Sequence, residues 1–274
     1  MSRLAPLFEK LKQEGRRAVV PYLVAGDPNE ALTVPLMHAL VDAGADIIEV
    51  GVPFSDPMSE GPTIQKAHER ALEGGTSLKS TLALVEDFRR TNATTPLVLM
   101  GYANPLERQG YAYVADACAD AGIDGLITVD LPPEEVAAMN TELQRRELDN
   151  IFLISPTTSD ERVATITQQA SGFIYYVALK GVTGAGNLDT AAVEAHLAII
   201  RAHSDLPVAV GFGIKDAETA ATVAGCADAV VVGSAMVDCI AAQYASESDP
   251  AAATEAAHSL ISTIRTGVNL ATSK

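Results

Sequence analysis

Eight short apolar segments alternate with helical patterns along the whole chain, and this alternation constrains the fold more than any other feature. Segments that are almost continuously apolar and rich in β-branched residues are typical of parallel strands covered on both faces. Strand–helix units in this number can close into a barrel or form an open, doubly wound sheet. The predicted strands are residues 18–24, 46–50, 96–100, 125–129, 151–154, 173–177, 207–210 and 229–232.

Length and continuity favour the closed barrel. The chain has 274 residues, and a (β/α)8 barrel takes about 250. No linker, low-complexity segment or shift in composition divides the sequence. We therefore predict a single domain, residues 1–274, with an α/β fold of the (β/α)8 or TIM barrel type. Amphipathic residues 1–17 predict an extra N-terminal helix, and residues 251–265 predict an additional helix near the C-terminus.

Local signals mark several helix ends. Asp27 followed by Pro28 and Glu30 predicts a helix capped by Asp27, with the proline at its first position. Residues 158–161 predict a second capped start. Gly74 and Gly122 stand where helix C-caps are expected.

Charge and composition exclude several classes of protein. A formal net charge of −16 repels nucleic acid and anionic membranes, which require basic patches. The sequence has neither an apolar run of about 20 residues for a membrane span nor the apolar region of a signal peptide. Its three cysteines form no CxxC pair, and none of its five histidines has metal-ligand spacing. We therefore expect a cytoplasmic protein with free thiols and without a metal site.

Glu49 is the first candidate catalytic residue. In a (β/α)8 barrel the active site lies at the C-terminal ends of the strands, and Glu49 interrupts an apolar strand near that end. A buried carboxylate is costly unless it is paired or used. Glu49 is therefore either a salt-bridged or capping residue, or a general acid and base whose pKa is raised by apolar surroundings.

The loop at residues 52–63 holds further candidates, because loops at this end of a barrel commonly carry function. Glu60 is the better candidate for a second catalytic carboxylate, whereas Asp56 has a rigid turn as its alternative. Asp130, after the fourth predicted strand, is expected either to brace its loop or to contact a partner.

Glycines after the seventh and eighth strands predict a phosphate site. Gly213 follows the seventh strand, and Gly233 and Ser234 lead from the eighth directly into a helix. Backbone N–H groups and a helix N-terminus at this place bind phosphate in many barrels, and they do so without a lysine. The alternative is that these glycines only allow close packing. Phe212 would add an aromatic wall beside the phosphate.

With these residues in view, the chain closely resembles the alpha subunits of tryptophan synthase. The most specific stretch is residues 52–65, which no other barrel family known to us carries. The matching segments are residues 20–22, 26–28, 49–57, 61–65, 101–105, 130–132, 181–184, 211–214 and 232–235.

The resemblance implies a retro-aldol cleavage of indole-3-glycerol phosphate to indole and glyceraldehyde 3-phosphate. It assigns to Glu49 the proton given to indole C3 and the proton taken from the glycerol hydroxyl. It assigns to the second carboxylate the indole N–H. There the sequence departs from the family, because Glu60 stands where the family usually has aspartate. The added methylene displaces the carboxylate by roughly 1 Å, and such a misplacement can cost about 10²-fold in rate.

The resemblance also implies roles for other residues, for each of which barrel core or close packing is the alternative. Tyr175 would contact the reacting end of the substrate, and Thr183 would steady the Glu60 loop when the site closes. The phosphate would be held by Gly184, Gly213, Gly233 and Ser234. The indole pocket would be lined by Tyr22, Met100, Tyr102, Ile127, Val129, Leu153 and Phe212.

The resemblance further implies an α2β2 complex, in which indole passes through a tunnel to a beta subunit that holds pyridoxal phosphate. The alpha chain itself would need no cofactor. The expected contact surface for the beta subunit is formed by Asp56, Pro57, Asn104, Pro105 and Pro132.

Three other functions remain open from the sequence. A barrel that has lost efficient chemistry could act as an allosteric partner of the beta subunit, and the Glu60 departure alone supports it. Another phosphosugar enzyme, an isomerase or aldolase, would share Gly213, Gly233 and Ser234 but would not explain residues 52–65. An acidic binding module would not explain a strand-end glutamate near a phosphate site.

Overall fold

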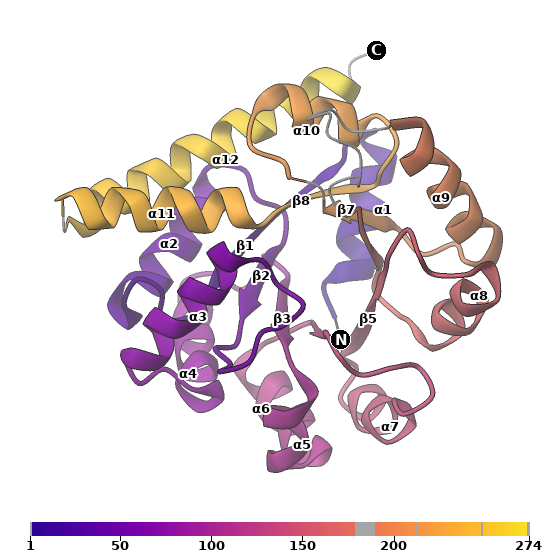
Figure 1. Cartoon of the computed structure of the whole chain (residues 1–274), viewed down its shortest axis with the longest axis horizontal. Coiled ribbons are helices and arrows are strands. Elements are labelled where there is room, and N and C mark those ends of the chain that lie inside the picture. Colours follow the sequence, from indigo (N-terminus) through magenta and orange to yellow (C-terminus); the bar gives the residue numbers. More distant parts are fainter. Residues whose placement is uncertain (1, 179–189, 212, 248, 273–274) are drawn as a thin grey trace.

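The computed structural model describes residues 2–178, 190–211, 213–247 and 249–272. Eight parallel strands close into a barrel in chain order, and β8 pairs with β1 (Figure 1). The predicted (β/α)8 fold is therefore confirmed, with strand boundaries shifted by a few residues. The strands are β1 (Ala18–Val24), β2 (Ile48–Gly51), β3 (Leu97–Gly101), β4 (Gly125–Thr128), β5 (Asp149–Ile154), β6 (Ile174–Val177), β7 (Val208–Gly211) and β8 (Ala229–Val232).

Helices surround the barrel, and in Figure 1 α1 lies behind it. None of the described helices is both long and apolar enough to cross a membrane. The helices are α1 (Leu4–Gln13), α2 (Glu30–Asp42), α3 (Pro62–Glu73), α4 (Leu78–Arg89), α5 (Ala103–Gln109), α6 (Tyr111–Ala121), α7 (Ala137–Arg145), α8 (Asp160–Gln169), α9 (Thr190–His203), α10 (Ala217–Ala224), α11 (Ser234–Glu247) and α12 (Pro250–Thr272).

The inside of the barrel is filled in layers. Val20, Ile47 and Phe173 belong to a buried interior cluster, which Leu4 and Phe8 of α1 close at the N-terminal end of the strands. Because side chains alternate between the two faces of a strand, the residues two positions further on also face the interior. These residues are Tyr22, Glu49 and Tyr175, one layer nearer to the C-terminal ends of the strands.

Three of the predicted helices need correction, and the first of them, α1, ends at Gln13 and not at residue 17. The helix after β1 begins at Glu30, because the side chain of Asn29 accepts a hydrogen bond from the Leu32 N–H and acts as the N-cap. The predicted cap, Asp27, is buried and instead pairs with Arg70 of α3, through bonds of 2.6 and 2.9 Å. This pair ties the end of β1 to α3.

The third correction concerns the end of the C-terminal helix. α12 extends from Pro250 to Thr272, beyond the predicted residue 265. Buried Ile261, Ile264 and Val268 recur at helical spacing, so the packed face continues past the predicted end.

A prediction of stability arises where α12 crosses the start of α10. A Cβ atom on Gly267 would lie 2.1 Å from the carbonyl oxygen of Ala217 and 2.7 Å from its Cα. Both atoms are backbone, so neither can rotate away. Gly267→Ala would gain about 1 kcal/mol of helix propensity, but the overlap should leave a net loss of about 2 kcal/mol in the free energy of unfolding.

Urea denaturation would measure this loss, with Gly74→Ala as the matched control. Gly74 ends α3 at φ −70°, and an added Cβ there meets only carbonyls of its own helix. Equal denaturation midpoints for the two variants would contradict the prediction.

Candidate active site

Glu49 lies inside the mouth of the barrel, as predicted. It pairs in register with Tyr22 of β1 and Val98 of β3, and it is 2% exposed. Among the described residues, its Oε1 atom has no hydrogen-bond partner. Burial, and after it the negative charge of Glu60, raise the pKa of Glu49 to about 8. Near neutral pH the group is therefore mainly a neutral acid that can donate a proton, and the carboxylate that remains can accept one.

Glu60 reaches the same interior from the loop before α3. Gly61 is the N-cap of α3 and Pro62 its first residue, so the helix begins directly after this glutamate. The Glu60 side chain is 6% exposed. Its Oε2 atom accepts a hydrogen bond from the Tyr22 hydroxyl at 3.3 Å and lies 3.3 Å from His68 Nε2. The structure thus brings the two candidate carboxylates into one electrostatic environment.

Sequence reasoning missed His68. Its side chain is buried on α3, and the Phe54 N–H donates to its Nδ1 atom at 3.0 Å. The one signal for it in the sequence is a polar residue among the apolar positions of an amphipathic helix, beside Ala67 and Ala71. That pattern alone does not distinguish a core histidine from one that serves a site.

Two glycines make room for two tyrosine rings at this end of the barrel. A Cβ atom on Gly51 would lie 2.3 Å from the Tyr22 hydroxyl, and one on Gly211 would lie 2.6 Å from the Tyr175 hydroxyl. Burial, followed by the charges of Glu49 and Glu60, raises the pKa of both tyrosines well above 10. Both phenols therefore stay protonated and can donate hydrogen bonds.

The other predicted pocket residues lie at different depths. Met100 and Leu153 pack on the interior cluster together with Tyr175, whereas Ile127 is part of that buried cluster. Val129 is partly buried just after β4. Phe212 lies outside the described residues.

Tyr102 holds the loop that carries Glu60. The Ser59 N–H donates to its hydroxyl at 3.2 Å, and its ring stacks on Phe54 with centroids 4.9 Å apart. Burial, and after it the charge of Glu60, raise the pKa of Tyr102 to about 12.

The predicted phosphate site lies where β7 and β8 end side by side. Ser234 is the first residue of α11, so its helix N-terminus faces this end of the barrel. An added Cβ on Gly233 would meet nothing within 4 Å, and Gly213 has φ +41°. The space and the backbone N–H groups suit an anion. Thr183 and Gly184 lie outside the described residues.

Comparison with known proteins shows the family to which the chain belongs. The family model described as "Tryptophan synthase alpha chain" matches residues 8–265. The chain belongs to the tryptophan synthase alpha chain family. Relatives of that name include one from Thioalkalivibrio sulfidiphilus, 56% identical over 265 residues that cover 97% of this chain and 98% of the relative. Another, from Thiobacillus denitrificans, is 57% identical over 238 residues, 87% of each chain.

Solved structures of tryptophan synthase agree with this assignment. The alpha subunit from Legionella pneumophila is 44% identical, with a TM-score of 0.91 over 98% of this chain and 99% of that one. A tryptophan synthase chain from Mycobacterium tuberculosis is 36% identical, with a TM-score of 0.86 over 98% of this chain and 99% of that one. A tryptophan synthase alpha chain implies a beta subunit as its partner.

The residues predicted to contact that subunit differ in exposure. Asp56 and Asn104 are exposed, and Pro105 and Pro132 are partly exposed. Pro57 is buried within this chain, which the sequence did not anticipate. Asp130 connects the loop after β4 with the start of α5. Its Oδ1 atom accepts a hydrogen bond of 2.7 Å from the N–H of Ala103, the first residue of that helix.

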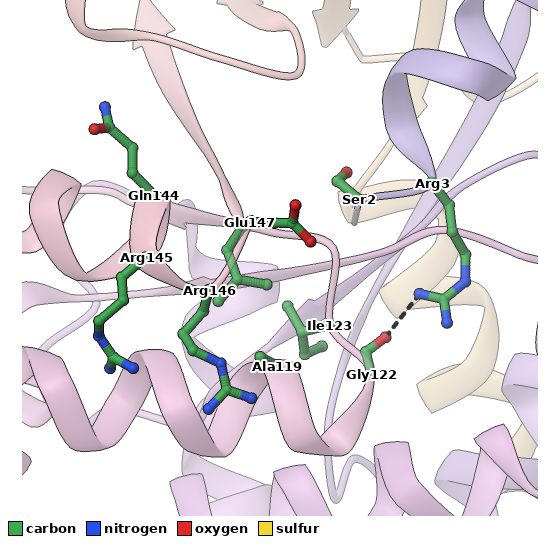
Figure 2. Close-up of a pocket in the computed structure, with 10 residues that line it drawn as sticks. Ser2, Arg3, Ala119, Gly122, Ile123, Gln144, Arg145, Arg146 and Glu147 are labelled. Atoms are coloured by element: carbon green, nitrogen blue, oxygen red, sulfur yellow. Dashed lines mark hydrogen bonds between the residues drawn. The ribbon is translucent and has the colours of Figure 1, made fainter.

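A separate cavity of about 600 Å³ lies between the ends of α6 and α7 and the N-terminus. Figure 2 shows Arg145 and Arg146, at the C-terminal end of α7, reaching toward α6, and Arg3 donating to the Gly122 carbonyl. All three arginines are paired with aspartates: Arg3 with Asp124, Arg145 with Asp116, and Arg146 with Asp116 and Asp120. The charges of these arginines are therefore already compensated within the chain.

Proposed function

We propose that the carboxyl groups of Glu49 and Glu60 have different roles in the reaction of this lyase. The chain catalyses the alpha reaction of tryptophan synthase, the cleavage of indole-3-glycerol phosphate to indole and glyceraldehyde 3-phosphate in L-tryptophan biosynthesis. Family membership and relatives at 52–57% identity support this reaction. The observation that carries the proposed mechanism is the burial of Glu49 in the mouth of the barrel, which together with the charge of Glu60 raises its pKa to about 8.

Glu49 is the proton carrier. In its neutral form it donates a proton to indole C3, and the ring nitrogen takes up positive charge. The resulting carboxylate then removes the proton from the glycerol hydroxyl on the carbon bonded to C3. That carbon becomes the aldehyde as the carbon–carbon bond breaks, and the bonding electrons return to the ring and neutralise the nitrogen. Glu49 ends protonated, so one group with a pKa near the working pH serves both transfers.

Glu60 is the acceptor for the indole N–H. A carboxylate at the indole N–H stabilises the reacting molecule most when positive charge develops on the ring. The stabilisation is strong because electrostatic interactions are strong in a site that excludes water. The Tyr22 hydroxyl and His68 Nε2 both lie at its Oε2 atom, so Oε1 takes no part in these contacts. We propose that Oε1 faces the substrate.

The remaining residues position the substrate. We propose that Tyr175 contacts the reacting end and that Tyr22, Met100, Tyr102, Ile127, Val129, Leu153 and Phe212 line the indole pocket. We propose that Gly184, Gly213, Gly233 and Ser234 hold the phosphate and that Thr183 assists closure. For Gly233 and Ser234 the support is the helix N-terminus at α11, which favours an anion without a lysine.

We propose an α2β2 complex with a beta subunit that holds the pyridoxal phosphate, while this chain works without a cofactor in the cytoplasm. The contact surface is proposed to include Asp56, Asn104, Pro105 and Pro132. Met58 supports this surface, because it lies in the same loop as Asp56 and is 74% exposed. Large apolar side chains so exposed are common where a partner binds.

The test is indole release from indole-3-glycerol phosphate by the purified chain, alone and with a tryptophan synthase beta subunit. We expect turnover alone and faster turnover with the partner. No turnover under either condition, together with activation of the beta subunit, would instead favour a purely regulatory partner.

A further inference from the structure

We propose that His68 is a positioning residue that holds the Glu60 carboxylate, and that these two residues are matched in length. The proposal rests on the role of Glu60 proposed above. It concerns a residue on α3 that does not itself touch the reacting atoms.

The hydrogen bonds of His68 determine which nitrogen carries its proton. The Phe54 N–H donates to Nδ1, so Nδ1 acts as an acceptor and carries no hydrogen. In a neutral imidazole the proton is then on Nε2. Nε2 faces Glu60 Oε2 at 3.3 Å and the Tyr22 hydroxyl oxygen at 3.4 Å. His68 thus connects the loop backbone at Phe54 with the carboxylate of Glu60, so the place of the loop determines where that carboxylate lies.

Burial makes this contact costly to lose. His68 is 1% exposed and the Glu60 side chain is 6% exposed, so neither has ready access to water as a replacement partner. A donor and a charged acceptor that are buried in this way are strongly destabilised when unpaired. The Nε2–H donor, together with the Tyr22 hydroxyl, therefore favours one rotamer of Glu60.

The distances also explain why residue 60 is a glutamate in this chain and not an aspartate. A side chain shorter by one methylene would withdraw the carboxylate by roughly 1 Å. Contacts that are 3.3 Å long with glutamate would then exceed hydrogen-bond length. Glu60 can reach Tyr22 and His68 from its loop, whereas an aspartate at this position could not without movement of the loop.

Two substitutions separate positioning from simple packing. In His68→Gln, the side-chain amide nitrogen can occupy the place of Nε2 and donate to Glu60, but the acceptor for Phe54 is lost. In His68→Asn, the amide oxygen can replace Nδ1 as acceptor for Phe54, but the shorter side chain has no donor that reaches Glu60. We expect kcat for indole release to fall about 10- to 100-fold in the Asn variant. In the Gln variant it should stay within about 3-fold of the native value, with KM little changed in both.

A double-mutant cycle tests the matched lengths. We expect His68→Asn to lower kcat by less than about 3-fold in a Glu60→Asp background, because the shorter carboxylate has already lost the contact. Equal effects of His68→Asn in both backgrounds would overturn the proposal, as would equal losses in the Gln and Asn variants. Melting curves would establish that each variant is folded.

Glu60→Gln in the same assay tests the role of Glu60 separately from the role of His68. Full activity of Glu60→Gln would overturn the role proposed for Glu60 itself. Loss of activity in Glu60→Gln, with native kcat in His68→Asn, would overturn only the role of His68.

Discussion

Glu49→Gln is expected to lower kcat for indole release by about 10⁴-fold, the upper end of what general acid–base catalysis contributes. Glutamine has nearly the same shape, but it can neither give a proton to indole C3 nor take one from the glycerol hydroxyl. Glu49 serves both transfers in the proposed mechanism, so both are lost together. Single-turnover assays with the beta subunit present would measure the residual rate.

Glu60→Gln is the matched control for this loss. It keeps a hydrogen-bond acceptor for the indole N–H but removes the negative charge, so we expect a smaller decrease of about 10²-fold. A Glu49→Gln variant that retains more than about a tenth of the native kcat would contradict the role of Glu49 as proton carrier.

The same Glu49→Gln substitution is expected to stabilise the fold at alkaline pH by about 3–5 kcal/mol. The pKa of Glu49 is raised from 4.5 to about 8, mainly by burial. Below pH 4.5 the group is protonated in both the folded and the unfolded chain, so its ionisation does not lower the free energy of unfolding. As pH rises from 4.5 to about 8, the unfolded chain releases this proton and the folded chain keeps it. The native protein therefore loses stability across this window, and glutamine does not.

Denaturation of both proteins near pH 5 and pH 8.5 would measure this difference. The gain should be small at the lower pH and near its full size at the higher one. Glu73→Gln, at an exposed position near the end of α3, is the control and should change stability by less than about 0.5 kcal/mol at both. A pH-independent gain in Glu49→Gln would show that its carboxyl group has an ordinary pKa.

Taken together, the two expected results describe a catalytic residue that weakens the fold it belongs to. A carboxyl group placed in the apolar mouth of a barrel lowers stability, and the same surroundings raise its pKa into the range useful for catalysis. Among the described residues, the Oε1 atom of Glu49 has no hydrogen-bond partner, which agrees with a group that is held ready for a substrate.

Much of the architecture followed from local patterns. Strands buried on both faces are apolar almost throughout, so the eight segments were visible, and Glu49 stood out as a charged residue near the C-terminal end of one of them. Chain order and parallel pairing then predicted which strand ends meet. The helix after β1 was placed less well, because two neighbouring polar residues, Asp27 and Asn29, can each cap a helix.

The sequence by itself determined the barrel, the strand that carries Glu49 and the family, because periodicity and short motifs are properties of contiguous residues. Only the tertiary structure decided the contacts of His68 with Phe54 and Glu60, the pairing of Asp27 with Arg70, and the room that Gly51 makes for Tyr22. Each of these depends on atoms that different segments bring within a few ångströms. No local pattern encodes such distances, because they are set by how the whole barrel packs.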